Sequence, residues 1–176
     1  RSELHCSGGF AMTNAAVLNI YASPTNSSVT EYGALLNVAG SMDLRPGSMV
    51  YPYSQGTNGA GVLFRTGDLT VGAGAAFDAT TKGYTGGFAG SGFGPGKGLL
   101  SGGGGHGGRG GRATDTNSGM TNGVEVAPIG AGSGGGSNSG ILASNGGGLI
   151  WIESTGKVHL DGGKLLANSG KGGNVT

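Results

Sequence analysis

The chain has 176 residues, of which 44 are glycine, and its formal net charge at pH 7 is +1. The length fits one domain with a modest core. A balance this close to neutral gives no electrostatic reason to expect nucleic acid or an anionic membrane as a partner. No run of about 18 apolar residues is present, so the sequence predicts no membrane insertion.

The composition also argues against disorder and against collagen. Charged residues make up only 11% of the chain and strand-like apolar runs recur, unlike in most disordered sequences. The glycines follow no three-residue period and only five prolines accompany them, which excludes a collagen triple helix. Low charge combined with abundant Ser, Thr, Asn and Gly predicts an extracellular or cell-surface protein.

The N-terminal part has the pattern of short strands separated by turns. Residues 16–21 form an apolar, strand-like run, and Pro24 with residues 25–28 marks a turn. A second apolar run follows at residues 34–38. No segment carries a convincing helical period, because the best candidate, residues 12–20, is short and strand-prone at its end. The sequence therefore predicts an all-β protein.

Three segments share the pattern Gly-x-Φ-x-Φ-x-x-Gly-x-x-Φ without a gap, where Φ is an apolar residue. They occupy residues 40–50, 67–77 and 156–166. The second begins 27 residues after the first, and the third begins 89 residues after the second. Each follows another short apolar stretch, at residues 35–38, 62–64 and 149–152 respectively.

This repeat favours a solenoid of parallel strands. The Φ-x-Φ alternation directs two side chains to one face of a strand, and the later glycine permits a sharp corner before the next strand. Short strands and tight corners that return at a fixed spacing are typical of a β-solenoid. An antiparallel sandwich also uses short strands and glycine turns, but its strands have no reason to share corner positions.

The repeat is interrupted by residues 82–148, which hold 27 of the 44 glycines. Prolines at positions 95 and 128 stiffen this segment, and it contains large apolar side chains at intervals. These are Tyr84, Phe88, Phe93, Leu99, Leu100, Val124, Val126 and Ile129. We therefore predict one domain, residues 1–176, in which residues 82–148 are an ordered glycine-rich insertion rather than a flexible linker.

Several glycine-rich segments together resemble a known type of surface protein. The segments are residues 102–111, 132–136, 146–150, 158–162 and 165–173. Their combination is similar to a unit of glycine-rich surface proteins of plants and protists, and of bacterial surface proteins of pectin-lyase-like type. The resemblance covers about residues 67–173 and implies a right-handed parallel β-helix on an extracellular protein. In those families the unit usually continues into further glycine-rich repeats.

His106 and Arg109 are the only bulky polar side chains among the glycines of residues 102–111. One hypothesis is that backbone N–H groups and Arg109 together hold an anion, such as a carboxylate or sulfate on a glycan. The interpretation that we favour is that both side chains bind backbone carbonyl groups and lock the insertion in place.

The sequence predicts no enzyme, cofactor or metal site. Polysaccharide lyases and hydrolases on this fold need carboxylates or a basic residue gathered on one face, and the nearest set is Asp161 with Lys157 or Lys164. The three histidines, at positions 5, 106 and 159, have no second metal ligand at usable spacing. No Gly-Lys-Ser/Thr follows the loose glycine patterns, so a phosphate-binding loop is not supported.

Three residues are candidates for covalent modification. Asn26 and Asn174 each begin an Asn-x-Ser/Thr sequon, which is an acceptor for glycosylation. Cys6 is the only cysteine, so a disulfide can form only between chains. The alternative for Cys6 is a small thiol that is buried or lies near a frayed terminus.

These observations predict a structural extracellular protein that self-associates into a surface fibre, filament or matrix. Assembly would use open solenoid edges or donation of a strand by the segment before Tyr21. The alternative is a carbohydrate-binding or adhesive module of a larger surface protein, with glycans as partners and His106 and Arg109 in contact with them.

Overall fold

The computed structural model describes residues 1–26, 31–111, 116–123 and 130–171. The regular secondary structure within these ranges consists of β-strands alone, as predicted. Most of the strands belong to three four-stranded sheets, here named A, B and C. The pairings inside these three sheets are parallel, which excludes the antiparallel sandwich.

Each sheet takes one strand from each of four successive stretches of the chain. Sheet A contains β1 (Ser2–Cys6), β4 (Tyr32–Val38), β7 (Gly61–Thr66) and β12 (Ile150–Ser154), in that order. Sheet B contains β2 (Phe10–Met12), β5 (Met42–Leu44), β8 (Leu69–Val71) and β13 (Val158–Leu160). Sheet C contains β3 (Val17–Tyr21), β6 (Met49–Tyr53), β9 (Ala76–Asp78) and β14 (Lys164–Leu166).

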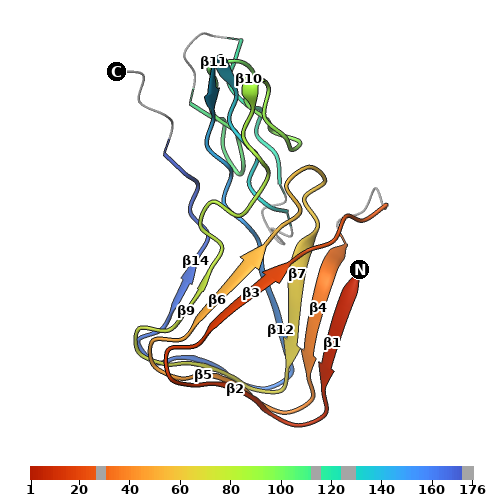
Figure 1. The fold of residues 1–176 in the computed structure, drawn as a ribbon, viewed down its shortest axis with the longest axis vertical. Helices are drawn as coiled ribbons and strands as arrows, with labels where there is room; N and C mark the ends of the chain where they lie inside the picture. Colours follow the sequence, from red (N-terminus) through yellow and green to blue (C-terminus); the bar gives the residue numbers. More distant parts are fainter. Residues whose placement is uncertain (27–30, 112–115, 124–129, 172–176) are drawn as a thin grey trace.

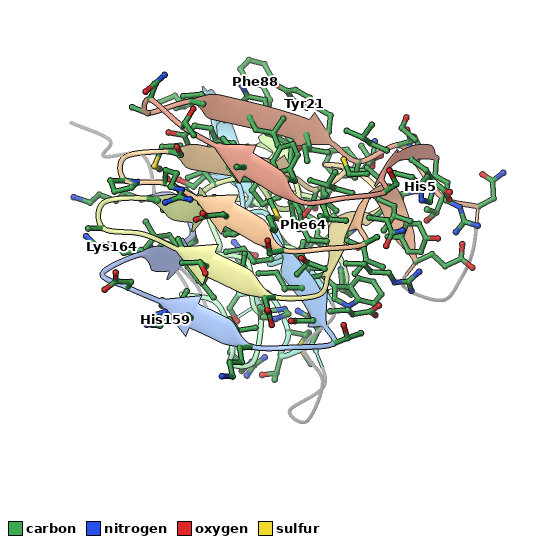
Figure 2. The ribbon with its side chains drawn as sticks, turned by 90° about the horizontal axis from the view of Figure 1, so that it is seen from below. His5, Tyr21, Phe64, Phe88, His159 and Lys164 are labelled. Carbon is green, nitrogen blue, oxygen red and sulfur yellow. The ribbon has the colours of Figure 1, made fainter. Side chains whose placement is uncertain are left out.

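The chain therefore visits sheets A, B and C in the same order four times (Figure 1). We call each visit a pass and the four passes together the stack. The first pass is β1–β3 and the last pass is β12–β14, and these lie at opposite edges of the three sheets (Figure 2).

The Φ-x-Φ positions of the repeat lie in register, as the sequence pattern predicts. Met42 pairs with Leu69 and Leu44 with Val71, and all four side chains are buried. The corner glycine of the second copy, Gly74, has a positive φ of 70°, which favours glycine because a Cβ strains this conformation.

The third copy departs from the ungapped pattern. Leu160 pairs with Val71, but Lys164 pairs with Ala76, so the last corner is one residue shorter than the one before it. The corner glycine is Gly162, with a φ of 70°, and not Gly163. Leu165, not Leu166, consequently lies opposite Phe77. The ungapped alignment missed this change because apolar residues occupy both positions 165 and 166.

A further copy of the repeat lies in the first pass and was not recognised from the sequence. Phe10 pairs with Met42 and Met12 with Leu44, so the first pass has the same inward-facing positions as the second. Its corner is formed by Asn14 and Ala15, with φ angles of 56° and 53°. Because an alanine occupies the usual glycine position, the glycine-based pattern did not include this copy.

The core lies inside the stack and is formed by the inward side chains of successive passes (Figure 2). Phe64 from β7 and Phe77 from β9 meet edge to face, with ring centroids 5.0 Å apart. The remaining core side chains are mainly aliphatic, so the layers of the stack are held together largely by apolar burial. They are Met12, Ala34, Leu36, Val38, Met42, Leu44, Val50, Val62, Leu69, Val71 and Ala75.

The glycine-rich insertion leaves the stack after β9 and returns at β12. Figure 1 shows it extending to one side of the three sheets. It contains one antiparallel pair, β10 (Phe88–Gly90) with β11 (Ser137–Leu142), in its outer part (Figure 1). We call residues 83–148 of this insertion the lobe. Three of the large apolar side chains noted in the sequence of the insertion, Val124, Val126 and Ile129, belong to residues 124–129, which lie outside the described ranges.

Candidate functional site

The candidate site is the edge of the stack formed by β12, β13 and β14. Each of these strands is the outermost member of its sheet, with a strand neighbour on one side only. Such an edge presents backbone N–H and C=O groups on its free side and can pair with another strand. Strands β1, β2 and β3 form the corresponding edge at the other end of the stack.

The inward positions of the last pass are apolar but exposed to solvent. Val158 and Leu160 are 52% and 44% exposed, whereas their register partners Leu69 and Val71 are 1% and 0% exposed. Leu165 is 43% exposed, whereas its partner Phe77 is fully buried. The same sequence pattern therefore has opposite exposure in two adjacent passes, because among the described residues no strand pairs with the free side of the last pass.

The first pass is also incompletely covered. Leu4, whose partner Leu36 is buried, is 57% exposed. Phe10, Leu18 and Ile20 are partly buried against the core. Both ends of the stack thus carry apolar side chains that a further layer of strands would cover.

A hollow of about 720 Å³ lies where the last pass meets the lobe. Ile150, Val158 and Leu165 line it from the stack, and Gly104, Gly105 and His106 are among the residues that line it from the lobe. On this side, the exposed apolar edge therefore borders glycine-rich lobe surface.

Backbone hydrogen bonds between extended glycine-rich segments hold the lobe together. Tyr84 and Gly87 donate to the carbonyl groups of Gly132 and Gly135, at 3.0 and 2.8 Å. Gly132 and Gly135 in turn donate to Gly147 and Ser144, at 2.8 and 3.0 Å. In both pairs of segments the partners recur every three residues, which is the period of the polyproline II helix.

Glycine is required in the lobe because the segments approach one another at backbone distance. A Cβ atom added to Gly102 would overlap the carbonyl group of Asn117, and one added to Gly134 would overlap that of Thr85. Both glycines are buried. The described part of the lobe is therefore packed closely because side chains are absent.

Three polar side chains that the sequence analysis did not single out fasten the lobe. Asn122 Nδ2 donates to the carbonyl group of Gly105 at 2.7 Å. Ser133 Oγ accepts from the amide of Gly96 at 3.0 Å, and Asn145 Oδ1 accepts from the amide of Gly86 at 2.9 Å. Single Asn and Ser residues are common in Gly- and Ser-rich sequences, so nothing local distinguishes these three.

The structure places His106 and Arg109 on the exposed surface of the lobe. His106 Nδ1 lies 3.4 Å from Asn122 Oδ1, and Arg109 Nη2 lies 3.5 Å from Met120 Sδ. Among the described residues, the hydrogen-bond partners of the two side chains therefore belong to the lobe itself and are side-chain atoms.

Tyr84 and Thr85 join the lobe to the stack. The Tyr84 hydroxyl donates to the carbonyl group of Asn58 at 3.1 Å, and the amide of Thr85 donates to the carbonyl group of Gly56 at 2.9 Å. Both acceptors belong to the loop between β6 and β7. Burial raises the pKa of Tyr84, because the charged phenolate loses hydration there.

The remaining predicted residues lie apart from one another. Asn26 is exposed, whereas Asn174 lies outside the described residues. Cys6 is a free thiol that packs partly against the core. Asp161, Lys157 and Lys164 are exposed on the last pass, where the amide of Lys157 donates to Asp68 Oδ1 at 2.7 Å.

The described residues contain no group of three or more His, Cys, Asp or Glu side chains placed to hold a metal ion. The same residues include no helix that is long and apolar enough to cross a membrane.

Comparisons of the chain with protein-family models, with curated proteins and with solved structures found no match.

Proposed function

We propose that this protein is a short right-handed parallel β-helix that acts as a structural subunit of an extracellular fibre or matrix. Copies associate through the open edges of the stack. The ordered visits to sheets A, B and C support the β-helix, because they place equivalent strands of successive passes side by side. Solenoids of this kind bury a continuous core only by stacking, and their uncapped ends are sites of association.

The observation that carries the proposal is the exposure of Val158, Leu160 and Leu165 at inward positions. Burying an aliphatic side chain of this size contributes about 1.5–3 kcal/mol. A neighbouring layer of strands would bury all three and would also pair with the free backbone groups of the last pass.

Edge-to-edge stacking suits the structure better than donation of an N-terminal strand. The segment before Tyr21 forms β1, β2 and β3, each of which pairs with a strand of the same chain. Donation would require these three pairings to break, whereas stacking leaves them intact.

The lobe extends to one side of the three sheets (Figure 1). In a fibre it would recur once per subunit as a rigid projection. The exposed Asn26 would be accessible to glycosylation in an extracellular protein, and intact-mass measurement before and after glycosidase treatment tests whether it carries sugar.

Sedimentation velocity and negative-stain electron microscopy across a range of protein concentrations test the proposed assembly. We expect oligomers that lengthen with concentration, and Leu160→Glu should suppress them because it places a carboxylate in the apolar joint. Leu100→Glu, which changes a similarly exposed leucine of the lobe, is the matched control. A wild-type protein that stays monomeric at high concentration contradicts the proposal.

A further inference from the structure

We infer that a second copy of the chain joins in one register only, with its first pass continuing the stack beyond the last pass. In this joint β1 of the second copy pairs with β12, β2 with β13, and β3 with β14. This inference rests on the proposed function and adds to it the identity of the paired strands and residues.

The register follows from the rows of residues that run across each sheet. In sheet A, Leu4 pairs with Leu36, Leu36 with Phe64, and Phe64 with Ile152. Continuing this row by one strand places Leu4 of the second copy beside Ile152. The joint therefore repeats a pairing that the chain already makes three times within itself.

Rows continued in this way place apolar side chains together at the inward positions. In sheet B, Val158 would meet Phe10 and Leu160 would meet Met12. In sheet C, Leu165 would meet Leu18. A shift by one residue would turn the inward side chains of one copy outward, because side chains alternate between the faces of a strand.

One outward row of the joint would bring a histidine beside a carboxylate. One row of sheet A runs from His5 through Asn37 and Arg65 to Glu153, and Arg65 Nε already contacts Glu153 Oε2 at 2.7 Å. Continuing the row places His5 of the second copy beside Glu153. The other charged group that contacts His5 is Glu3, at 3.2 Å.

The single cysteine makes this register testable with one substitution. Cys6 and Ser154 lie one residue beyond His5 and Glu153, on inward positions of β1 and β12. In the joint their Cα atoms would be about 4.8 Å apart, the usual spacing of neighbouring strands. That spacing lies within the range of about 4.4–6.8 Å that a disulfide requires.

Ser154→Cys should therefore give a ladder of disulfide-linked oligomers on non-reducing gels after mild oxidation of the assembled protein. A bond within one chain is excluded because β1 and β12 are separated by two other strands, which places them about 14 Å apart. Lys157→Cys, an exposed position three residues further along and so about 10 Å from Cys6 of the second copy, is the matched control and should give no ladder. Adding Cys6→Ser to Ser154→Cys should abolish the ladder while leaving the assembly intact.

A second variant pair tests the same register without cysteine chemistry. His5→Glu places a like charge beside Glu153 and should raise the concentration needed for assembly about twofold to fivefold, the range expected for an exposed ion pair. Combining it with Glu153→Lys should restore assembly, since the pair is then of opposite charge.

The outcomes separate this inference from the proposed function. Assembly without a Ser154→Cys ladder, or a ladder equally strong for Lys157→Cys, overturns the register and leaves self-association standing. A protein that remains monomeric overturns both.

Discussion

The stack and the lobe are packed in opposite ways. In the stack, large side chains such as Phe64 and Phe77 fill the space enclosed by three sheets. In the lobe, buried glycines such as Gly102 and Gly134 leave no space to fill, and carbonyl groups of neighbouring segments occupy the place of a side chain.

This difference shows that two kinds of interaction stabilise the folded chain. The stack is stabilised by removal of apolar surface from water, a term that grows with the area buried. The lobe gains backbone hydrogen bonds and close contacts, but each ordered glycine loses more conformational entropy than any other residue. The lobe therefore depends on its attachment to the stack, and the contacts of Tyr84 and Thr85 supply that attachment.

Truncating one phenylalanine in each region should give the largest contrast. Phe64→Ala should lower the free energy of unfolding by about 3–5 kcal/mol, because it opens a cavity in the core. Phe88→Ala, in the lobe, changes a side chain that is 68% exposed rather than 1%, and should have little effect. Urea denaturation measures both, and comparable losses would show that the lobe shares a core with the stack.

Adding one methyl group tests the close packing within the lobe. Gly134→Ala inserts a Cβ against the Thr85 carbonyl group and should destabilise the lobe by about 1–3 kcal/mol, as overpacking does elsewhere. Gly108→Ala is the control, since a Cβ there meets nothing within 4 Å. Hydrogen exchange of the lobe amides should rise in the first variant only, and unchanged protection in Gly134→Ala would refute the close packing.

Removing one polar fastener should have a smaller effect. Asn145→Ala leaves the Gly86 amide without its acceptor and should cost about 0.5–1.5 kcal/mol of local stability, the net contribution of a typical hydrogen bond, because this pair is only partly buried. We expect faster exchange at residues 83–87 and no change in the core strands. Asn138→Ala, at an exposed lobe position, serves for comparison. Equal exchange in the two variants would mean that Asn145 does not fasten the lobe.

The smallest effect expected is the response of the lobe attachment to alkaline pH. Because the pKa of Tyr84 is raised in the folded protein, the unfolded chain loses this proton first, and stability falls as pH rises above about 10. Burial and the neighbouring Tyr21 also raise the pKa of Tyr53, so Tyr84→Phe must be compared with the wild type. A wild-type pH dependence identical to that of Tyr84→Phe would exclude a contribution from Tyr84.

The sequence by itself determined the Φ-x-Φ strands of the repeat and which of their residues face inward. Met42 with Leu44 and Leu69 with Val71 could be recognised because side-chain alternation is a property of the strand alone. The insertion at residues 82–148 could be recognised because it separates two copies of the same local pattern.

Only the tertiary structure decided the features that depend on neighbours in space. The corner at Gly162 shortened and the corner at Ala15 formed without glycine, because each corner adapts to the pass beside it. Asn122, Ser133 and Asn145 became fasteners only where a glycine amide or carbonyl group lies against them. Val158 and Leu160 have the same pattern as Leu69 and Val71, yet they are exposed because, in the described part of the chain, no further strands lie over the last pass.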